Sequence, residues 1–220
     1  PVDRTEKFMF DGERLIQHII KQRYFEEEIS DEVNLSYSDN QVTVTTDYLT
    51  LIYTLNSEGY ASQCVYSLSS QNRIYHFSYS AEGYLTGIVE NIDDTEYSST
   101  SLTYENGDIT SISSKMNGLE NKFIYEPGEE SSKYHLPCLG LLEIHPLTFH
   151  IEALYAGLLG KDPRHFTIRS CPAGSNDEKT VYSYGFDKKG NPSRMICQTT
   201  YAGGQASYYP YTRNISISFE

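Results

Sequence analysis

The chain has 220 residues, of which 38% are hydrophobic and 21% charged, as is usual for a folded protein with a substantial core. Asp and Glu outnumber Lys and Arg by 30 to 17, which gives a formal net charge of −13. This balance argues against nucleic acid and anionic membrane surfaces as partners, because both are bound through clustered Lys and Arg. No stretch approaches the roughly 20 apolar residues that a membrane-spanning helix needs, so we expect no membrane span.

Near the N-terminus the pattern leaves two interpretations open. Residues 12–28 carry a weak helical periodicity, whereas residues 15–20 also fit a strand. The chain begins at Pro1 without a signal peptide, which we interpret as a mature or trimmed form of the protein.

A hairpin phrase recurs along most of the chain. Each copy has apolar residues two apart, a short polar turn ending in Gly, and apolar residues two and five positions after that Gly. The copies lie at residues 77–88, 102–112 and 184–195, with incomplete ones at 8–16, 35–40, 51–64 and 123–128. Residues two apart share one face of a strand, and Asn106-Gly107 is typical of a tight hairpin turn. The spacing of two and then five breaks strict alternation and predicts either a β-bulge or a late change of pairing after each turn.

A segment of different character interrupts the hairpins. Leu147, Ile151, Leu154 and Leu158 step by four, three and four, which is the spacing of one helical face. Pro146 suits the first turn of a helix, and Gly160 suits its end. The spacing therefore predicts an amphipathic helix over residues 147–158 that covers the aromatic face of the sheet.

These elements define one expected architecture. We predict a mainly β fold, a curved open antiparallel meander of hairpins with one amphipathic helical insert packed on the sheet. The whole chain, residues 1–220, is expected to form a single domain. Its hairpin repeats occupy about residues 8–125 and 180–220, and its helical insert about residues 135–165.

The recurring pattern of Tyr, polar turn, Gly and two apolar residues resembles the YD-type hairpin repeat. That repeat occurs in large Rhs shells and in smaller secreted lipoproteins of Bacteroidetes-type bacteria. The insert ending in residues 155–161, Tyr-Ala-Gly-Leu-Leu-Gly-Lys, is similar to a segment of one such lipoprotein family, a domain of unknown function. The resemblance implies a bacterial protein that is secreted, periplasmic or anchored to the outer membrane through a lipid on its precursor.

The cysteines suggest packing more than chemistry. Cys64 occupies a repeat position filled elsewhere by Ile, and Cys197 shares the face of Met195, so both are expected in the core. Cys138 and Cys171 flank the insert, and a disulfide between them is an open alternative.

Metal and acid–base chemistry find little support in the residue spacing. The histidines around the insert, His135, His145, His150 and His165, match no common ligand spacing and are interpreted as structural or surface residues. Acidic residues cluster at 26–32 and 93–96 without the alternating pattern of a calcium loop, and we interpret them as solvated charge. We therefore assign no catalytic residue, metal ligand or cofactor.

Aromatic residues near the C-terminus are the candidate ligand-binding group. Tyr208, Tyr209 and Tyr211 follow a Gly-Gly turn and flank Pro210, so they either stack on a ligand or form the edge before a closing strand. The function favoured is a non-enzymatic binding or scaffold module that recognises a glycan or another envelope protein. The alternative is a glycan-active hydrolase whose carboxylates come from separate strands.

Overall fold

The computed structural model describes residues 3–24, 27–68, 71–131, 141, 144–175, 177–188, 192–201 and 211–219. The described residues form fifteen strands and one short α-helix. The first eight strands are β1 (Asp3–Asp11), β2 (Arg14–Tyr24), β3 (Glu27–Tyr37), β4 (Gln41–Thr45), β5 (Thr50–Leu55), β6 (Ala61–Leu68), β7 (Gln71–Tyr79) and β8 (Leu85–Ile92). The others are β9 (Thr95–Glu105), β10 (Asp108–Met116), β11 (Leu119–Ser131), β12 (His165–Pro172), β13 (Lys179–Phe186), β14 (Pro192–Thr200) and β15 (Tyr211–Phe219).

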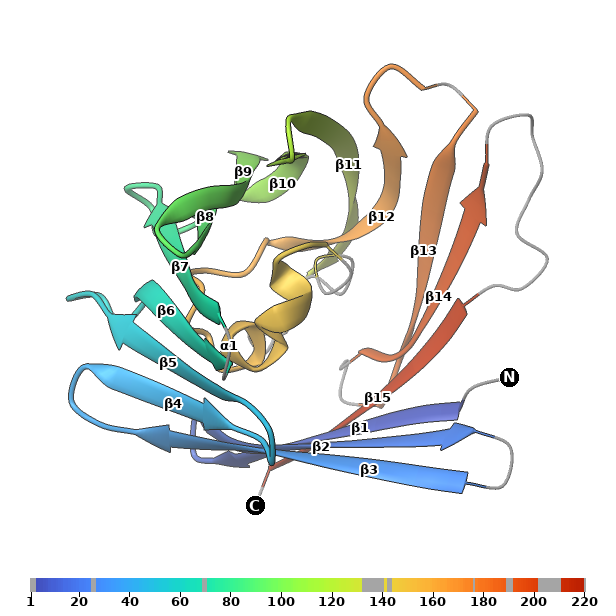
Figure 1. Ribbon diagram of the computed structural model, residues 1–220. Helices are drawn as coiled ribbons and strands as arrows, with labels where there is room; N and C mark the ends of the chain where they lie inside the picture. Colours follow the sequence, from blue (N-terminus) through green and yellow to red (C-terminus); the bar gives the residue numbers. More distant parts are fainter. Residues whose placement is uncertain are drawn as a thin grey trace.

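The strands form one strongly curved meander, and the insert lies on its concave side (Figure 1). Strands that follow one another in the chain pair antiparallel, and β15 also pairs in parallel with β1, so the strand order returns to its start. Between β12 and β13, however, only two residue pairs are in register, and the two ribbons diverge away from them (Figure 1). The predicted class is confirmed as a mainly β, antiparallel meander that opens between β12 and β13; the parallel pair is a departure from the expected order.

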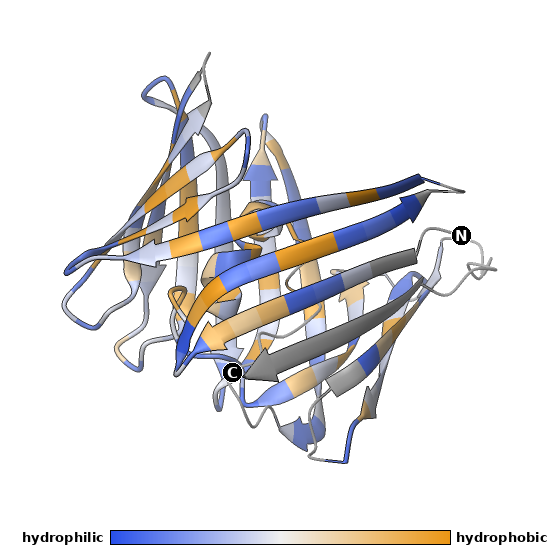
Figure 2. Ribbon diagram, turned by 90° about the horizontal axis from the view of Figure 1, so that it is seen from below, coloured by the Kyte–Doolittle hydropathy of each residue, from blue (hydrophilic) through white to orange (hydrophobic). Residues whose placement is uncertain are grey.

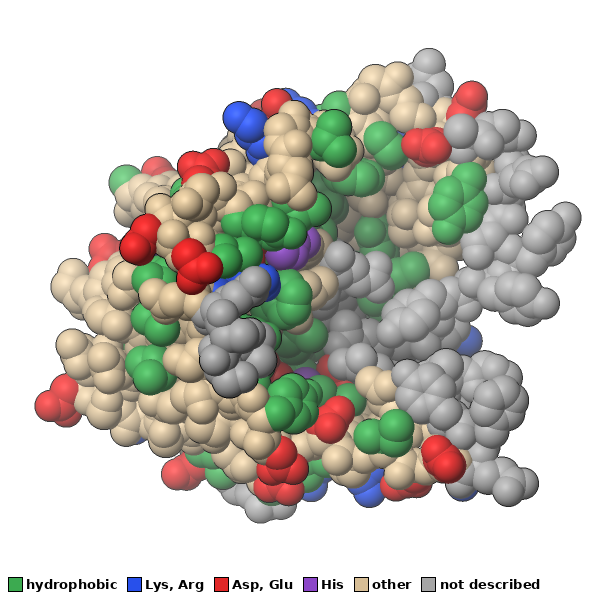
Figure 3. Space-filling view, in the orientation of Figure 1, with side chains coloured by type: hydrophobic (Ala, Val, Ile, Leu, Met, Phe, Trp, Pro, Cys, Tyr) green, Lys and Arg blue, Asp and Glu red, His purple; other side chains and the backbone are tan. Residues whose placement is uncertain are grey.

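Residues 14–24 form β2, so the strand interpretation of the N-terminal segment is correct and the helical one is wrong. Alternating apolar and polar residues run along the strands, as Figure 2 shows. In β4 and β5, Val42 faces Tyr53 and Val44 faces Leu51, and all four side chains are buried on the concave side. Hydrophobic side chains therefore gather in the hollowed middle of the molecule, whereas many acidic side chains lie around its periphery (Figure 3).

The bulges predicted after the hairpin glycines are present. The register shifts between Ser78 and Tyr79 where β7 pairs with β8, and between Ile109 and Ser111 where β10 pairs with β9. Each bulge adds one residue between the apolar positions two and five places after the Gly, so both positions point inward. In the copy at residues 102–112, Ile109 and Ile112 are accordingly both buried.

The insert is less regular than the sequence predicts. A 3-10 turn covers Leu147–Phe149, and the α-helix α1 covers only Ile151–Tyr155. The backbone leaves the helical conformation at His150, where the two segments join. Leu147, Leu154 and Leu158 are nevertheless buried, so the predicted apolar face and its packing are confirmed, although a continuous helix over residues 147–158 is wrong.

The tyrosines at the third position of three hairpin copies pack toward the core. Tyr53 is fully buried, and Tyr79 and Tyr104 are half-buried against the core. The Tyr79 hydroxyl donates a hydrogen bond to the carbonyl of Ala61 at 2.7 Å. Tyrosine therefore fills the core with its ring and satisfies a backbone group at the margin of the core.

Candidate ligand-binding groove

A groove forms where two hairpin turns and the end of the insert meet. The ladder between β8 and β9 ends at the pair Gly87 and Ser101, and beyond it the strands lead to separate turns. The segment after the insert crosses both turns: the Lys161 amide donates to the Gly83 carbonyl at 2.8 Å, and the Arg164 amide donates to the Gly107 carbonyl at 3.1 Å. These two hydrogen bonds hold residues 161–164, which form the rim of the groove, against both hairpin turns.

The turn sequences explain this geometry. Asn106 and Gly107 have φ values of 54° and 88°, the conformation for which Asn-Gly is the preferred pair. The Tyr84 hydroxyl and the Arg164 side chain lie where a Cβ on Gly107 would stand, at 2.7 and 2.6 Å. Two features of this position therefore require glycine: its positive φ and the close approach of the neighbouring side chains.

An aromatic pair forms part of the groove wall. The rings of Tyr84 and Tyr104 are stacked, with centroids 4.9 Å apart and an interplanar angle of 29°. Tyr104 packs against the core, so it supports Tyr84, which is half-buried in the groove wall. The supported ring offers a flat, preorganised surface to a ligand.

Hydroxyl, amide and charged side chains surround this pair. The groove has a volume of about 750 Å³ and is lined by Ser80, Glu82, Tyr84, Thr86, Leu102, Thr103, Tyr104, Asn106, Gly107, Lys161 and Arg164. A hydrogen bond from Ser80 lowers the pKa of Glu82, and nearby Lys161 lowers it further. Glu82 therefore carries a negative charge at neutral pH.

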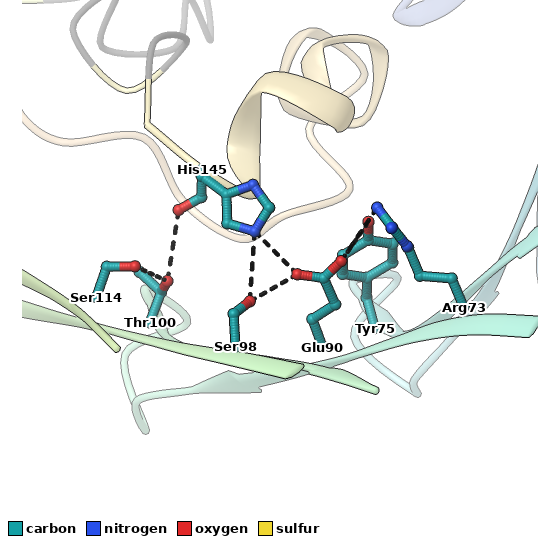
Figure 4. Close-up of polar contacts among 7 residues, drawn as sticks. All are labelled: Arg73, Tyr75, Glu90, Ser98, Thr100, Ser114 and His145. Carbon is teal, nitrogen blue, oxygen red and sulfur yellow. Dashed lines mark hydrogen bonds and ion pairs between the residues drawn. The ribbon is translucent and has the colours of Figure 1, made fainter. Parts of the chain in front are cut away.

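A second polar cluster lies inside the curved sheet and anchors the insert (Figure 4). The Glu90 carboxylate is fully buried and accepts hydrogen bonds from the Ser98 hydroxyl at 2.6 Å and the Tyr75 hydroxyl at 3.3 Å. It also pairs with His145 Nε2 at 2.9 Å and with Arg73 at 3.3 Å. A buried carboxylate with four partners is well compensated for its lost hydration.

This cluster contains a Ser, a His and a Glu but lacks the geometry of a hydrolytic triad. In a triad the acid contacts Nδ1 of the histidine and the nucleophile contacts Nε2. Here Glu90 and Ser98 both lie at Nε2 of His145, at 2.9 and 3.4 Å, and the Ser98 hydroxyl donates to Glu90. The arrangement holds the insert and does not activate Ser98.

A third cluster joins the insert to the N-terminal strands. The fully buried His18 ring lies between Glu152 of α1, at 2.7 Å from Nδ1, and Glu6 of β1, at 3.3 Å from Nε2. Burial alone lowers the pKa of His18, but the hydrogen bonds and charges of Glu152 and Glu6 together raise it above its ordinary value. The two carboxylates therefore favour the charged form of the His18 ring.

His150, by contrast, is held neutral. Its ring is fully buried among aromatic rings, and Nδ1 lies 2.8 Å from the Tyr53 hydroxyl. Burial, with a further contribution from His145, lowers the pKa of His150 to about 3. His145, His150 and His165 thus have structural contacts, and His165 pairs with Asp108 at 2.9 Å.

The remaining candidate residues have mixed outcomes. Tyr208, Tyr209 and His135 lie outside the described residues, and Tyr211 begins β15, where the side chains are not described. Cys64 and Cys197 are buried in the core, as expected. The disulfide alternative is wrong, because Cys171 is a free thiol; its suggested partner, Cys138, lies outside the described residues.

In the described part of the chain, most acidic residues of the two clusters lie at the surface. Glu27, Glu28, Asp93, Asp94 and Glu96 are exposed, in agreement with solvated charge. The described residues contain no group of three or more His, Cys, Asp or Glu side chains arranged to hold a metal ion. Within the same residues, no helix has the length and apolar character to cross a membrane.

Sequence reasoning missed the residues that form the groove. Tyr84 stands directly after the Gly of a hairpin copy, and Lys161 and Arg164 flank Pro163 at the end of the insert. Their places in the sequence indicate that one aromatic and two cationic side chains lie beside turns. Which turn the insert reaches depends on tertiary contacts, and nothing in the local pattern specifies it.

Comparisons with known proteins agree with the architecture. A family model described as a domain of unknown function (DUF4595) with porin-like fold matches residues 9–194. A crystal structure of a porin-like protein from Bacteroides uniformis ATCC 8492 superposes with a TM-score of 0.81 at 28% sequence identity, over 91% of this chain and 84% of that chain. No curated protein matches the chain.

Proposed function

The chain belongs to the DUF4595 family of porin-like domains of unknown function, and from that premise we propose that it is a non-enzymatic glycan-binding module of the bacterial cell envelope. The observation that carries this proposal is the groove with Tyr84 stacked on Tyr104. The C–H face of a sugar ring packs on the electron-rich face of an aromatic ring, and this contact needs a flat and rigid aromatic surface.

The polar lining of the groove supports the same ligand class. Ser80, Thr86, Thr103 and Asn106 place hydroxyl and amide groups around the aromatic pair. Such groups both donate and accept hydrogen bonds, as sugar hydroxyls do. A ligand whose ring stacks on Tyr84 therefore has hydrogen-bonding partners in the lining of the groove.

Binding is favoured over hydrolysis by the number of carboxylates at the groove. A glycosidase uses two carboxyl groups on either side of the scissile bond, about 5 to 10 Å apart. Among the described residues that line the groove, Glu82 is the single carboxylate. Glu6 and Glu152 do face each other across His18, but the three side chains pair with one another and fill the space between the carboxylates.

The envelope location rests on the family and on the Bacteroides porin-like neighbour. The YD-type repeat, the lipid anchor on the precursor and an envelope protein as partner stay predictions from the sequence. A glycan on or near the bacterial surface is the ligand that an envelope module of this kind would meet.

The proposal is tested by binding to an array of bacterial and plant oligosaccharides, followed by calorimetry on each sugar that binds. Tyr84→Ala removes the stacking surface and is expected to weaken binding by roughly tenfold or more. Tyr48→Ala is the matched control, because Tyr48 is 71% exposed on the turn between β4 and β5, away from the groove. Equal loss in both variants, or release of sugar from a glycoside by the unmodified protein, would contradict the proposal.

A further inference from the structure

The groove concentrates positive charge in an acidic protein. Among the described residues, its lining contains two cations, Lys161 and Arg164, and one carboxylate, Glu82, whereas the whole chain has a net charge of −13. Both cations belong to the short segment whose backbone is hydrogen-bonded to the two hairpin turns. The fold therefore fixes the backbone of both cations beside the groove.

Both cations remain available to a ligand. Within the described part of the chain, no carboxylate lies within ion-pair distance of Lys161 or Arg164. The Arg164 guanidinium donates a hydrogen bond to the carbonyl of Asn106 at 3.4 Å, and its stem packs against Gly107. The remaining N–H groups of Arg164 and the Lys161 ammonium can bind an anionic group that lies over the tyrosine pair.

We propose that the groove selects an anionic glycan, whose sugar ring stacks on Tyr84 while its carboxylate or sulfate group binds Lys161 and Arg164. This inference rests on the proposed glycan-binding function and narrows its ligand class. Glu82 opposes the two cations and reduces the affinity for anions, so it also limits how strongly a small free anion is held.

The lining favours a sugar over other anionic ligands. A long nucleic acid would be repelled by the overall charge of the protein. An acidic peptide offers carboxylates but few ring faces for Tyr84 and few hydroxyl groups for Thr86, Thr103 and Asn106. An acidic peptide is therefore included as a competitor in the test.

The test compares a galacturonate oligosaccharide with a galactose oligosaccharide of equal length, and adds a sulfated oligosaccharide and a poly-glutamate peptide. Affinities are measured by calorimetry for the full chain and three variants. In Lys161→Gln/Arg164→Gln, the ratio of acidic to neutral affinity is expected to fall roughly tenfold. In Glu82→Gln it is expected to rise, and in Lys115→Gln, which removes an exposed charge at the far end of β10, it should stay constant. The unfolding midpoint of each variant checks that the fold is intact.

The outcomes distinguish a failure of anionic selectivity from a failure of glycan binding itself. Tighter binding of the uronate or sulfate sugar, with the expected changes in ratio, supports it, and the tighter of the two identifies the anionic group. Equal affinity for acidic and neutral sugars overturns the anionic selectivity and leaves glycan binding in place. Absence of binding by every sugar overturns both proposals, and equal binding of poly-glutamate overturns the assignment to a glycan.

Discussion

At the scale of single residues, the pKa values of His150 and His18, two buried histidines at the insert, are shifted in opposite directions. His150 is surrounded by Tyr53, Tyr75 and Phe77, which favour the neutral ring, whereas His18 lies between two carboxylates, which favour the charged ring. The two rings therefore make the stability of the fold depend on pH in opposite directions.

The depressed pKa of His150, about 3, predicts destabilisation by acid. Below about pH 6.5 the unfolded chain takes up a proton at this residue while the native protein does not, so the free energy of unfolding falls by up to about 1.4 kcal/mol per pH unit. His150→Gln keeps a polar group near Tyr53 and removes the titration. Urea unfolding between about pH 4 and about pH 7 should show a shallower pH dependence in this variant; an unchanged slope would contradict the neutral buried ring.

The raised pKa of His18 predicts the reverse dependence. Its pairing with Glu152 and Glu6 contributes stability that is fully present below about pH 6.5 and is lost as the pH rises through the native pKa. Glu152→Gln removes one of the two charges and is expected to lower the pKa of His18. Titration of the His18 ring by NMR measures this shift, and Glu28→Gln, at an exposed carboxylate of β3, is the control.

At the scale of elements, two hairpin-turn glycines have similar backbone angles but different surroundings. Gly107 and Gly59 both have positive φ, at 88° and 84°. A Cβ on Gly107 would lie 2.6 Å from the Arg164 side chain and 2.7 Å from the Tyr84 hydroxyl, whereas a Cβ on Gly59 would meet nothing within 4 Å. Alanine substitutions at the two positions therefore separate the cost of backbone strain from the cost of displacing the segment after the insert.

Gly59→Ala is expected to cost about 1 to 2 kcal/mol of unfolding free energy, from backbone strain alone. Gly107→Ala is expected to cost more, because Arg164 and Tyr84 must also move. Denaturant unfolding of both variants measures the difference. An equal cost for the two would show that the segment after the insert is not held against this turn.

The sequence pattern was sufficient for the hairpins but not for the insert. The offsets of two and five after each Gly predicted the bulges, because these offsets depend only on local backbone geometry. The apolar spacing of residues 147–158 reports which side chains face the core, and two short helical pieces that join at His150 satisfy it as well as one helix does. Periodicity alone therefore overestimated the regularity of this segment.

The polar clusters could be predicted only in part. Glu90 is two residues after Ile88 and Glu6 two before Phe8, so strand alternation places both carboxylates on the inward face. Their partners could not be inferred, because His145 is 55 residues from Glu90, and His18 is 134 residues from Glu152. Such pairs depend on which strand the insert covers, and that depends on the whole fold.

At the scale of the whole molecule, the junction between β12 and β13 is the weakest join of the curved sheet. Arg169 opposite Val181 and Ser170 opposite Thr180 are its two residue pairs, whereas β7 and β8 have seven. Backbone amides at this junction should exchange with solvent faster than those of the pairing between β7 and β8. Hydrogen exchange followed by mass spectrometry measures both; similar protection in the two pairings would contradict this expectation.

The parallel contact of β1 with β15 joins the first and last described strands of the meander. Thr5 lies opposite Asn214, so this pairing links residues near the two ends of the sequence, and we expect it to form after the local hairpins. Until then the outer side of β1 has no neighbour, and an unpaired strand side attracts other chains. Contacts this distant in sequence form slowly. Completion of the sheet is thus the step at which folding competes most directly with association of unfinished molecules.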